Sequence, residues 1–140
     1  MPLVEDRAVA SLTAKAREAL KLAPSTIFRL PKTPADKPAR VAAVRETVGN
    51  AVDLCVEIHR RLDPHHAAGL AHELARFRPY FLEDPIVPDS VQRMGDLQRS
   101  VPVPIATGER LHTIWEFNEL LAAGGCRFVR PDVCLVGGLT

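Results

Sequence analysis

The chain has 140 residues, of which 46% are hydrophobic and 25% charged, a composition typical of one soluble globular domain or part of one. Its formal net charge of +1 excludes the strongly basic surface that a binder of the nucleic-acid backbone needs. No apolar run approaches the roughly 20 residues that cross a bilayer, and the first residues lack the pattern of a secretion signal. We therefore expect a cytoplasmic protein with neither a nucleic-acid nor a membrane partner.

Predicted helices and strands alternate along the chain. The helices show apolar residues at the 3.6-residue period, and the strands are short apolar runs. A proline-rich loop over 31–38 separates the first strand from the second helix. The predicted helices cover 5–22, 39–48, 65–77, 91–99 and 113–125. The predicted strands cover 26–30, 53–58, 80–82, 103–107 and 126–129, the last with an exit over 131–136.

The alternation repeats about every 25 residues, which favours parallel βαβ units in an α/β fold. An open doubly wound sheet and a (β/α)₈ barrel both remain possible. The run after the first strand, TIFRLPKTPADK, lacks the glycine-rich phosphate loop expected of the open sheet. We therefore predict an incomplete TIM-type barrel over residues 1–140, about strands two to six, because a complete barrel takes about 250 residues.

Three glutamates lie at predicted strand ends at equal intervals. Glu57, Glu83 and Glu109 are each separated by 26 residues, which is one βα repeat. In a parallel barrel such residues face the same mouth, on strands about 4.8 Å apart. Carboxylates about 4 Å apart repel by roughly 4 kcal/mol at an effective dielectric of 20. The spacing therefore predicts a cation such as Mg²⁺ among them.

The alternation of side chains along a strand extends this site. His59 is two residues beyond Glu57, so it is predicted to face the barrel mouth with that glutamate. Asp132 lies at a similar height on the last strand. The same parity predicts an inward-facing set made of Asp53, Cys55, Glu57, His59, Phe81, Glu83, Ile105, Thr107 and Glu109.

Other notable residues are assigned structural roles. We expect buried, reduced thiols at Cys55, Cys126 and Cys134. We expect the aromatic residues of the last helix, Trp115 and Phe117, to pack against the barrel, and the helical histidines, His65, His66 and His72, to be solvated. The glycine pair, Gly137 and Gly138, is expected to form a turn.

Four short motifs resemble the barrel domain of the enolase superfamily, in its mandelate racemase/muconate lactonizing branch. They are CVEIH at 55–59, FLEDP at 81–85, TGER at 107–110, and RPD followed by VGGLT within 130–140. The resemblance covers about residues 40–140 and is greatest to acid-sugar dehydratases of the galactonate dehydratase kind. Residues 1–39 are then a divergent helix, strand and proline-rich loop, and the family's smaller capping domain resembles nothing in this chain.

The resemblance implies a role for each matching residue. Glu57, Glu83 and Glu109 fall on the three magnesium ligands at the ends of the third, fourth and fifth barrel strands. His59 falls on a histidine that acts near the leaving hydroxyl. Asp132 resembles the aspartate that orients a catalytic histidine on the seventh strand, which would lie beyond Thr140. The implied substrate is an acid sugar, which loses the proton next to its carboxylate and a β-hydroxyl.

Two positions depart from the family pattern. The first ligand is usually aspartate, whereas this chain has Glu57, whose extra methylene moves the carboxylate outward. The racemases carry a Lys-x-Lys pair at the second strand, where this chain offers Arg29, with Lys32 in the loop. A racemase or cycloisomerase that uses that lysine is therefore disfavoured.

Two functional hypotheses remain open. The first is a fragment of a Mg²⁺-dependent acid-sugar dehydratase, a lyase. The second is a non-catalytic truncated remnant, or a half-barrel that binds a partner. In both, we expect the 140-residue chain alone to be inactive, and to self-associate or be completed by another chain.

Overall fold

Five parallel strands lie side by side in chain order in the computed structural model, which describes residue 14, the backbone of 25–29, and residues 37–138. The sheet order is β1-β2-β3-β4-β5, and each strand pairs with the next along the chain. The strands are β1 Ser25–Arg29, β2 Asp53–Glu57, β3 Phe81–Glu83, β4 Ile105–Thr107 and β5 Phe128–Val129.

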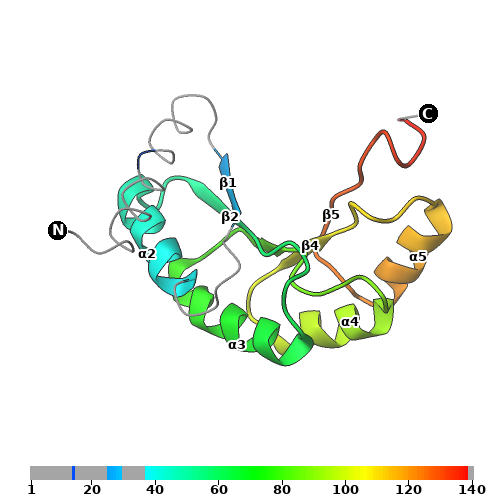
Figure 1. Ribbon diagram of the computed structural model, residues 1–140, viewed down its shortest axis with the longest axis horizontal. Coiled ribbons are helices and arrows are strands. Elements are labelled where there is room, and N and C mark those ends of the chain that lie inside the picture. The colour runs from blue at the N-terminus through cyan, green and yellow to red at the C-terminus, as the bar shows by residue number, and fades with distance from the viewer. Residues whose placement is uncertain (1–13, 15–24, 30–36, 139–140) are drawn as a thin grey trace.

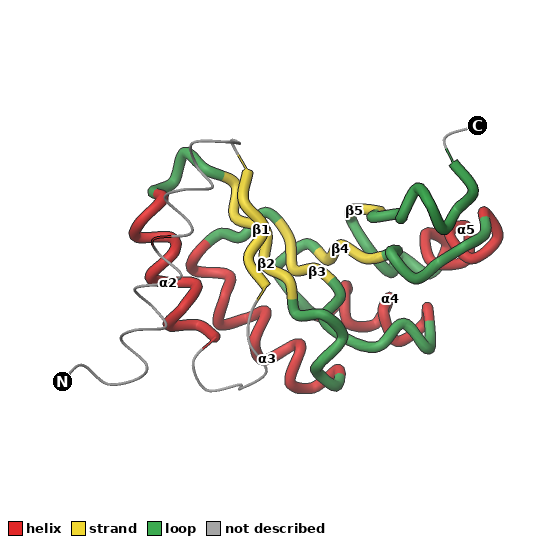
Figure 2. The backbone as a smooth tube through the Cα atoms, turned by 45° about the horizontal axis from the view of Figure 1, so that its top comes forward, coloured by secondary structure: helices red, strands yellow, loops and turns green. Residues whose placement is uncertain are grey.

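The helices between these strands all cover the same face of the sheet (Figures 1 and 2). A doubly wound sheet would carry helices on both faces and reverse its strand order. The observed order and the one-sided helices are those of a barrel segment, so the predicted incomplete TIM-type barrel is confirmed. The helices are α2 Lys37–Val48, α3 Pro64–Leu74, the 3₁₀ helix η1 Ala75–Phe77, α4 Val91–Ser100 and α5 Ile114–Ala122.

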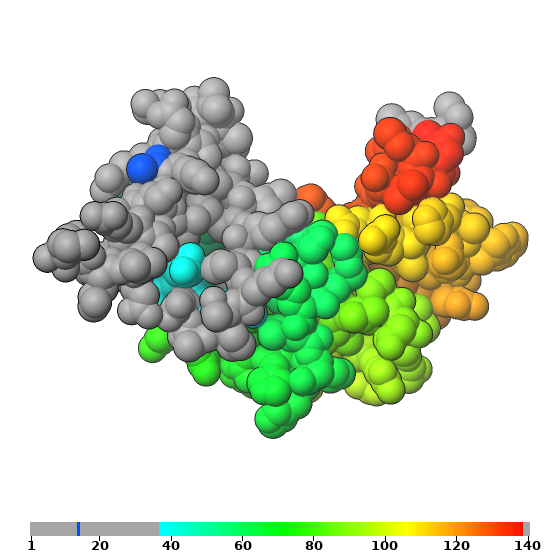
Figure 3. Space-filling view, in the orientation of Figure 1, coloured from blue at the N-terminus to red at the C-terminus, as the bar shows by residue number. Residues whose placement is uncertain are grey.

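Most predicted elements form close to their expected positions. The helix predicted over 5–22 and most of the loop predicted over 31–38 lie outside the described residues. The last strand is shorter than predicted, and the segment after it forms a turn over 133–137. This turn, in red, projects from the rest of the described surface (Figure 3). The positive φ angles of Gly137 and Gly138 agree with the predicted turn role of this pair.

Side-chain caps begin three of the helices. The Asp63 side chain accepts a hydrogen bond from the His66 backbone N–H at 2.9 Å, and Pro64 follows this cap at the start of α3. Ser90 caps α4 in the same way. Thr113 and Glu116 form a reciprocal capping box at α5. Each of these three helices therefore begins soon after the strand end that precedes it, and those strand ends carry the polar residues of the candidate site.

The sheet separates two apolar layers. The larger layer, between sheet and helices, contains Leu54, Val56, Leu82 and Ile105 together with apolar residues of α2 to α5. The smaller layer lies on the opposite face and consists of Cys55, Phe81, Ala106 and the partly buried Phe128. The prediction that Ile105 and Thr107 face inward is therefore wrong, because both alternate with Ala106 along β4. Leu82 is in register with Ile105, and Glu83 with Ala106, so Ala106 takes the inward position.

Two other expectations about burial are wrong. Cys134 is exposed, in the turn after β5, whereas Cys55 and Cys126 are buried free thiols as predicted. Trp115 is 75% exposed near the start of α5 instead of packing against the barrel. Phe117 is partly buried and approaches Gly108. Within the described part of the chain, no helix is long and apolar enough to cross a membrane.

Candidate metal and catalytic site

The three predicted glutamates lie at the carboxyl ends of neighbouring strands. Glu57 ends β2 and Glu83 ends β3, and the two are register partners in the parallel sheet. Glu109 lies two residues beyond the end of β4. The register partner of Glu83 is Ala106, three residues before Glu109. The equal spacing in sequence therefore gives equal height for the first two glutamates only.

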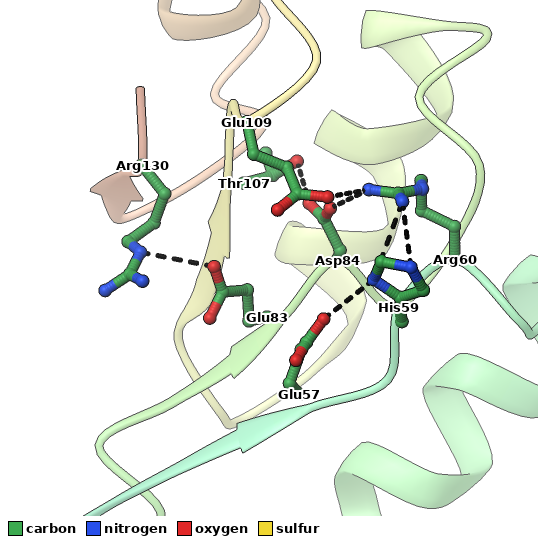
Figure 4. A network of polar contacts seen from close by, with 8 residues as sticks. All are labelled: Glu57, His59, Arg60, Glu83, Asp84, Thr107, Glu109 and Arg130. Atoms are coloured by element: carbon green, nitrogen blue, oxygen red, sulfur yellow. Dashed lines mark hydrogen bonds and ion pairs between the residues drawn. The ribbon is translucent and has the colours of Figure 1, made fainter. Parts of the chain in front are cut away.

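Gly108 allows the chain to turn back toward the site after β4. Its φ of +133° is in a region that favours glycine. A Cβ atom here would lie 3.0 Å from Phe117 Cε1 and 3.3 Å from the Arg130 backbone nitrogen. A side chain at this position would therefore be crowded by both neighbours, and the turn at Gly108 brings Glu109 beside the other carboxylates (Figure 4).

Each of the three carboxylates has a basic side chain as its own partner (Figure 4). The Nδ1 atom of His59 lies 2.8 Å from Oε1 of Glu57. The Nε atom of Arg130 lies 3.2 Å from Oε1 of Glu83. Arg60 donates a hydrogen bond to Glu109. The repulsion expected among the glutamates is thus offset within this chain by these three side chains.

A fourth carboxylate, Asp84, connects two of the strand ends. Its side chain is 3% exposed and accepts hydrogen bonds from Arg60 at 2.7 Å and from the Thr107 hydroxyl at 2.7 Å. Asp84, His59 and Arg60 all have positive φ angles, of 43°, 59° and 60°. These left-handed conformations end the simple alternation of side chains. His59 therefore reaches Glu57 through a turn of the backbone, and the predicted pleat does not explain its position.

The electrostatic environments of the carboxylates differ. Burial raises the pKa of Glu83, against the lowering effect of Arg130, and the nearby Asp84, Glu57 and Glu109 raise it further. Burial also raises the pKa of Asp84. The hydrogen bond from Arg60 lowers the pKa of Glu109. The surroundings therefore disfavour the ionised form of Glu83 and favour the ionised form of Glu109.

The donor set fits a hard divalent cation. Mg²⁺ prefers carboxylate oxygens and keeps several water ligands, and three carboxylates lie in one neighbourhood at these strand ends. Among the described residues, however, no three or more His, Cys, Asp or Glu side chains are arranged so that they could hold a metal ion together. The guanidinium of Arg60, bound to Glu109 and Asp84, supplies positive charge in this neighbourhood. Glu57, Glu83 and Glu109 are the residues that would hold the ion.

The structure places the other predicted site residues as follows. Asp132 is exposed after β5, and its Oδ1 accepts the Cys134 backbone N–H at 2.9 Å. It lines an open pocket together with Glu83, Glu109 and Arg130. Asp132 therefore lies beside the candidate site, although no contact between it and Glu57, Glu83 or Glu109 is found among the described residues.

The helical histidines are not brought to this site. The Nδ1 atom of His66 lies 2.6 Å from its cap residue Asp63, and Nε2 of His72 lies 3.0 Å from the Ser100 carbonyl oxygen. His65 stacks edge-on against the ring of His66. All three are exposed, in agreement with the predicted solvated face.

Sequence reasoning missed three members of this network. Arg60 and Asp84 stand directly after the predicted His59 and Glu83, and Arg130 precedes Pro131 at the last strand. Each adjoins a residue or motif that the sequence singled out, so the signal was present. Strand parity assigns the first two to the opposite face, and only the positive φ angles bring them back.

The raised pKa of Glu83 predicts a stabilising substitution. Because the native state favours the protonated form, the stability contributed by Glu83 is present at low pH and lost as pH rises through its native pKa. Glu83→Gln keeps the shape without the charge. We expect its Tm to exceed that of the wild type by a few degrees at neutral pH and to equal it below about pH 4, where a carboxyl is protonated in both states.

Glu109→Gln is the matched control and should have the opposite effect. Its carboxylate has a lowered pKa, so its stabilisation is present above the unfolded pKa and lost on acidification. Thermal unfolding followed by circular dichroism across this pH range measures both variants. A Glu83→Gln protein that is less stable than wild type at neutral pH would contradict the assigned environment.

Comparison with known proteins agrees with this geometry. Residues 4–140 match the family "Enolase C-terminal domain-like". The D-galactonate dehydratase of Xanthomonas campestris pv. campestris is 38% identical over 101 residues, which are 72% of this chain and 26% of that protein. The D-galactonate dehydratase of Verminephrobacter eiseniae is 36% identical over 102 residues, 73% of this chain and 27% of that protein. The chain thus spans about a quarter of these relatives.

Solved structures give the same result. A racemase from Streptomyces coelicolor A3(2) with bound magnesium superposes with a TM-score of 0.88 at 29% identity, over 93% of this chain and 37% of that one. The L-talarate dehydratase of Polaromonas sp. JS666, complexed with Mg and L-glucarate, gives 0.87 at 26% identity, over 94% and 37%. This chain therefore belongs to the enolase C-terminal domain-like family and forms part of a barrel domain of the enolase superfamily, in the mandelate racemase/muconate lactonizing branch.

Proposed function

We propose that this chain carries the metal-binding strands and the leaving-group acid of an acid-sugar dehydratase. The observation that supports this most directly is the grouping of Glu57, Glu83 and Glu109 at three successive strand ends, with His59 hydrogen-bonded to the first. The reaction would remove the proton next to the substrate carboxylate and expel a β-hydroxyl as water. The product would be a 2-keto-3-deoxy sugar acid.

The three glutamates would hold the cation that this reaction requires. Glu57, Glu83 and Glu109 would hold Mg²⁺, which acts as a Lewis acid toward the substrate carboxylate and stabilises the negative charge that develops when the α-proton leaves. The two buried glutamates, at the ends of β2 and β3, are fixed by the register of the sheet. The strands that carry them lie between two packed layers.

His59 is suited to protonate the departing hydroxyl. Its Nδ1 faces Glu57, so the carboxylate accepts the Nδ1 hydrogen and fixes the orientation of the ring. The Nε2 atom lies 3.2 Å from a guanidinium nitrogen of Arg60, so a protonated ring would deliver its proton from Nε2 once that contact opens. The side chain is 30% exposed, so part of the ring is open to solvent. Protonation by a positioned histidine makes the hydroxyl a better leaving group.

The pocket after β5 is the proposed binding place for the sugar acid. Its polar lining residues are Glu83, Glu109, Arg130 and Asp132. Arg130 is 40% exposed, and its Nε faces Glu83. The remaining guanidinium hydrogens can donate to hydroxyl or carboxylate oxygens of an acid sugar. Asp132 is proposed to orient a catalytic base in the complete active site.

A dehydratase fits the chain better than a racemase. The curated relatives are D-galactonate dehydratases, and one structural neighbour is a dehydratase bound to L-glucarate. A racemase with magnesium is also among the neighbours, but the lysine pair of such enzymes is absent from β1, which ends at Arg29. His59 provides an acid for elimination that a simple proton exchange does not require.

A chimera tests this function with the chain in a complete barrel. The 101-residue matched segment replaces its counterpart in the Xanthomonas campestris D-galactonate dehydratase. We expect Mg²⁺-dependent formation of a 2-keto-3-deoxy acid from at least one sugar acid in a panel of aldonates and aldarates. The unmodified relative is the control for the assay. A folded chimera that binds metal but dehydrates no sugar acid would refute the proposal.

A further inference from the structure

Arg60 lies in a backbone conformation that is unfavourable for its residue type. Both His59 and Arg60 have φ angles near +60°, a region that glycine adopts readily and that costs other residues free energy. The Arg60 side chain is nevertheless only 14% exposed. An arginine held in this conformation, with its charged side chain mostly buried, indicates that its contacts offset the cost.

The guanidinium contacts residues of three strand ends. One terminal nitrogen of Arg60 donates to Asp84 at 2.7 Å and also donates to Glu109. The other terminal nitrogen lies 3.2 Å from Nε2 of His59. The two carboxylates differ in their burial and in their other partners. Asp84 is buried and also accepts from Thr107, whereas Glu109 is partly exposed and belongs to the proposed metal-binding set.

We propose that Arg60 is a built-in counter-cation that competes with the divalent metal for Glu109. The inference rests on the proposed function of Glu57, Glu83 and Glu109. In the protein without metal, the guanidinium neutralises Glu109 and Asp84 together. When the metal binds, Glu109 is released from Arg60, while the guanidinium keeps Asp84, its more buried partner. The chain thereby keeps its carboxylates compensated without metal, at the expense of metal affinity.

Arg60→Gly is the direct test, because glycine suits the backbone and removes the cation. Arg78→Gly is the matched control. Arg78 also has a positive φ, of 50°, but it is exposed at the opposite end of β3 and its backbone carbonyl oxygen accepts from Arg45. Titration of the full chain with Mn²⁺, read by loss of the free-ion electron paramagnetic resonance signal, measures affinity for both variants.

We expect Arg60→Gly to bind Mn²⁺ at least about tenfold more tightly than the wild type, and Arg78→Gly to bind as the wild type does. A double variant, Arg60→Gly with Asp84→Asn, guards against loss of folding, because it leaves no buried charge unpaired. The double variant should show the same gain. Circular dichroism verifies that each variant is folded.

The outcomes separate this inference from the proposed function. Tighter binding in both Arg60 variants, with no change in Arg78→Gly, supports the competition. Equal Mn²⁺ affinity in wild type and both Arg60 variants overturns the inference while leaving the metal site in place. Absence of Mn²⁺ binding in every variant overturns both. An equal gain in Mn²⁺ affinity in Arg78→Gly would show that the effect comes from the change in net charge. It would also overturn the inference.

Discussion

Replacement of His59 by Asn in the chimera should lower the rate of dehydration about 100-fold or more, the contribution of a general acid. Asparagine is close in size and can still donate a hydrogen bond to Glu57, but it cannot deliver a proton. Exchange of the substrate's α-hydrogen with solvent deuterium should persist at a much higher fraction of its original rate. The expected signature is therefore a variant that opens the C–H bond but rarely completes elimination.

His66→Asn provides the matched control for this substitution. His66 is exposed at the start of α3 and contacts Asp63, so its replacement should leave turnover unchanged. Dehydration is followed by the appearance of the 2-keto acid, and exchange by proton nuclear magnetic resonance. If His59→Asn reduces both rates equally, or neither, the assignment of His59 to the leaving hydroxyl is wrong.

A polypeptide of these 140 residues alone should self-associate and show no dehydratase turnover. The outer edge of β5 has no strand partner among the described residues, and unpaired parallel edges favour association. Apolar side chains also lie exposed near this edge. They are Ile114, Trp115, Leu121 and Val129. Association would cover this surface without completing the sugar-acid pocket.

Size-exclusion chromatography with light scattering measures this association. A Trp115→Ser, Leu121→Ser variant, which removes two of the exposed apolar side chains, should shift the population toward monomer. The sugar-acid panel supplies the activity measurement. A well-folded monomer that dehydrates any sugar acid at about 1 s⁻¹, a typical enzymatic rate, would contradict this expectation.

The order of strands and helices was predictable because it depends on local patterns. Helix periodicity, short apolar strands and the Asp63-Pro64 cap all act over a few residues, and the structure confirms them. The placement of Glu57 beside Glu83 was also predictable, since β2 and β3 are separated by a regular unit. The limits of the elements were less accurate at the last strand, whose pairing with β4 extends over two residues.

The position of β4 was not predictable from spacing. The connection through α4 is shorter than one full repeat, so Ala106 pairs with Glu83 and Glu109 lies beyond the strand. The inward parity assigned to Ile105 fails for the same reason. Alternation also ends where Arg60 and Asp84 adopt left-handed conformations. Such turns depend on tertiary hydrogen bonds, which a sequence pattern does not contain.

Calorimetric titration with Mg²⁺ tests the central claim that the three glutamates form a metal site. The comparison is between the wild-type chain and a Glu83→Gln, Glu109→Gln double variant, which keeps side-chain size and removes two of the three proposed ligand charges. We expect modest, saturable Mg²⁺ binding by the wild type and none by the double variant. Equal binding by the two proteins would contradict the assignment.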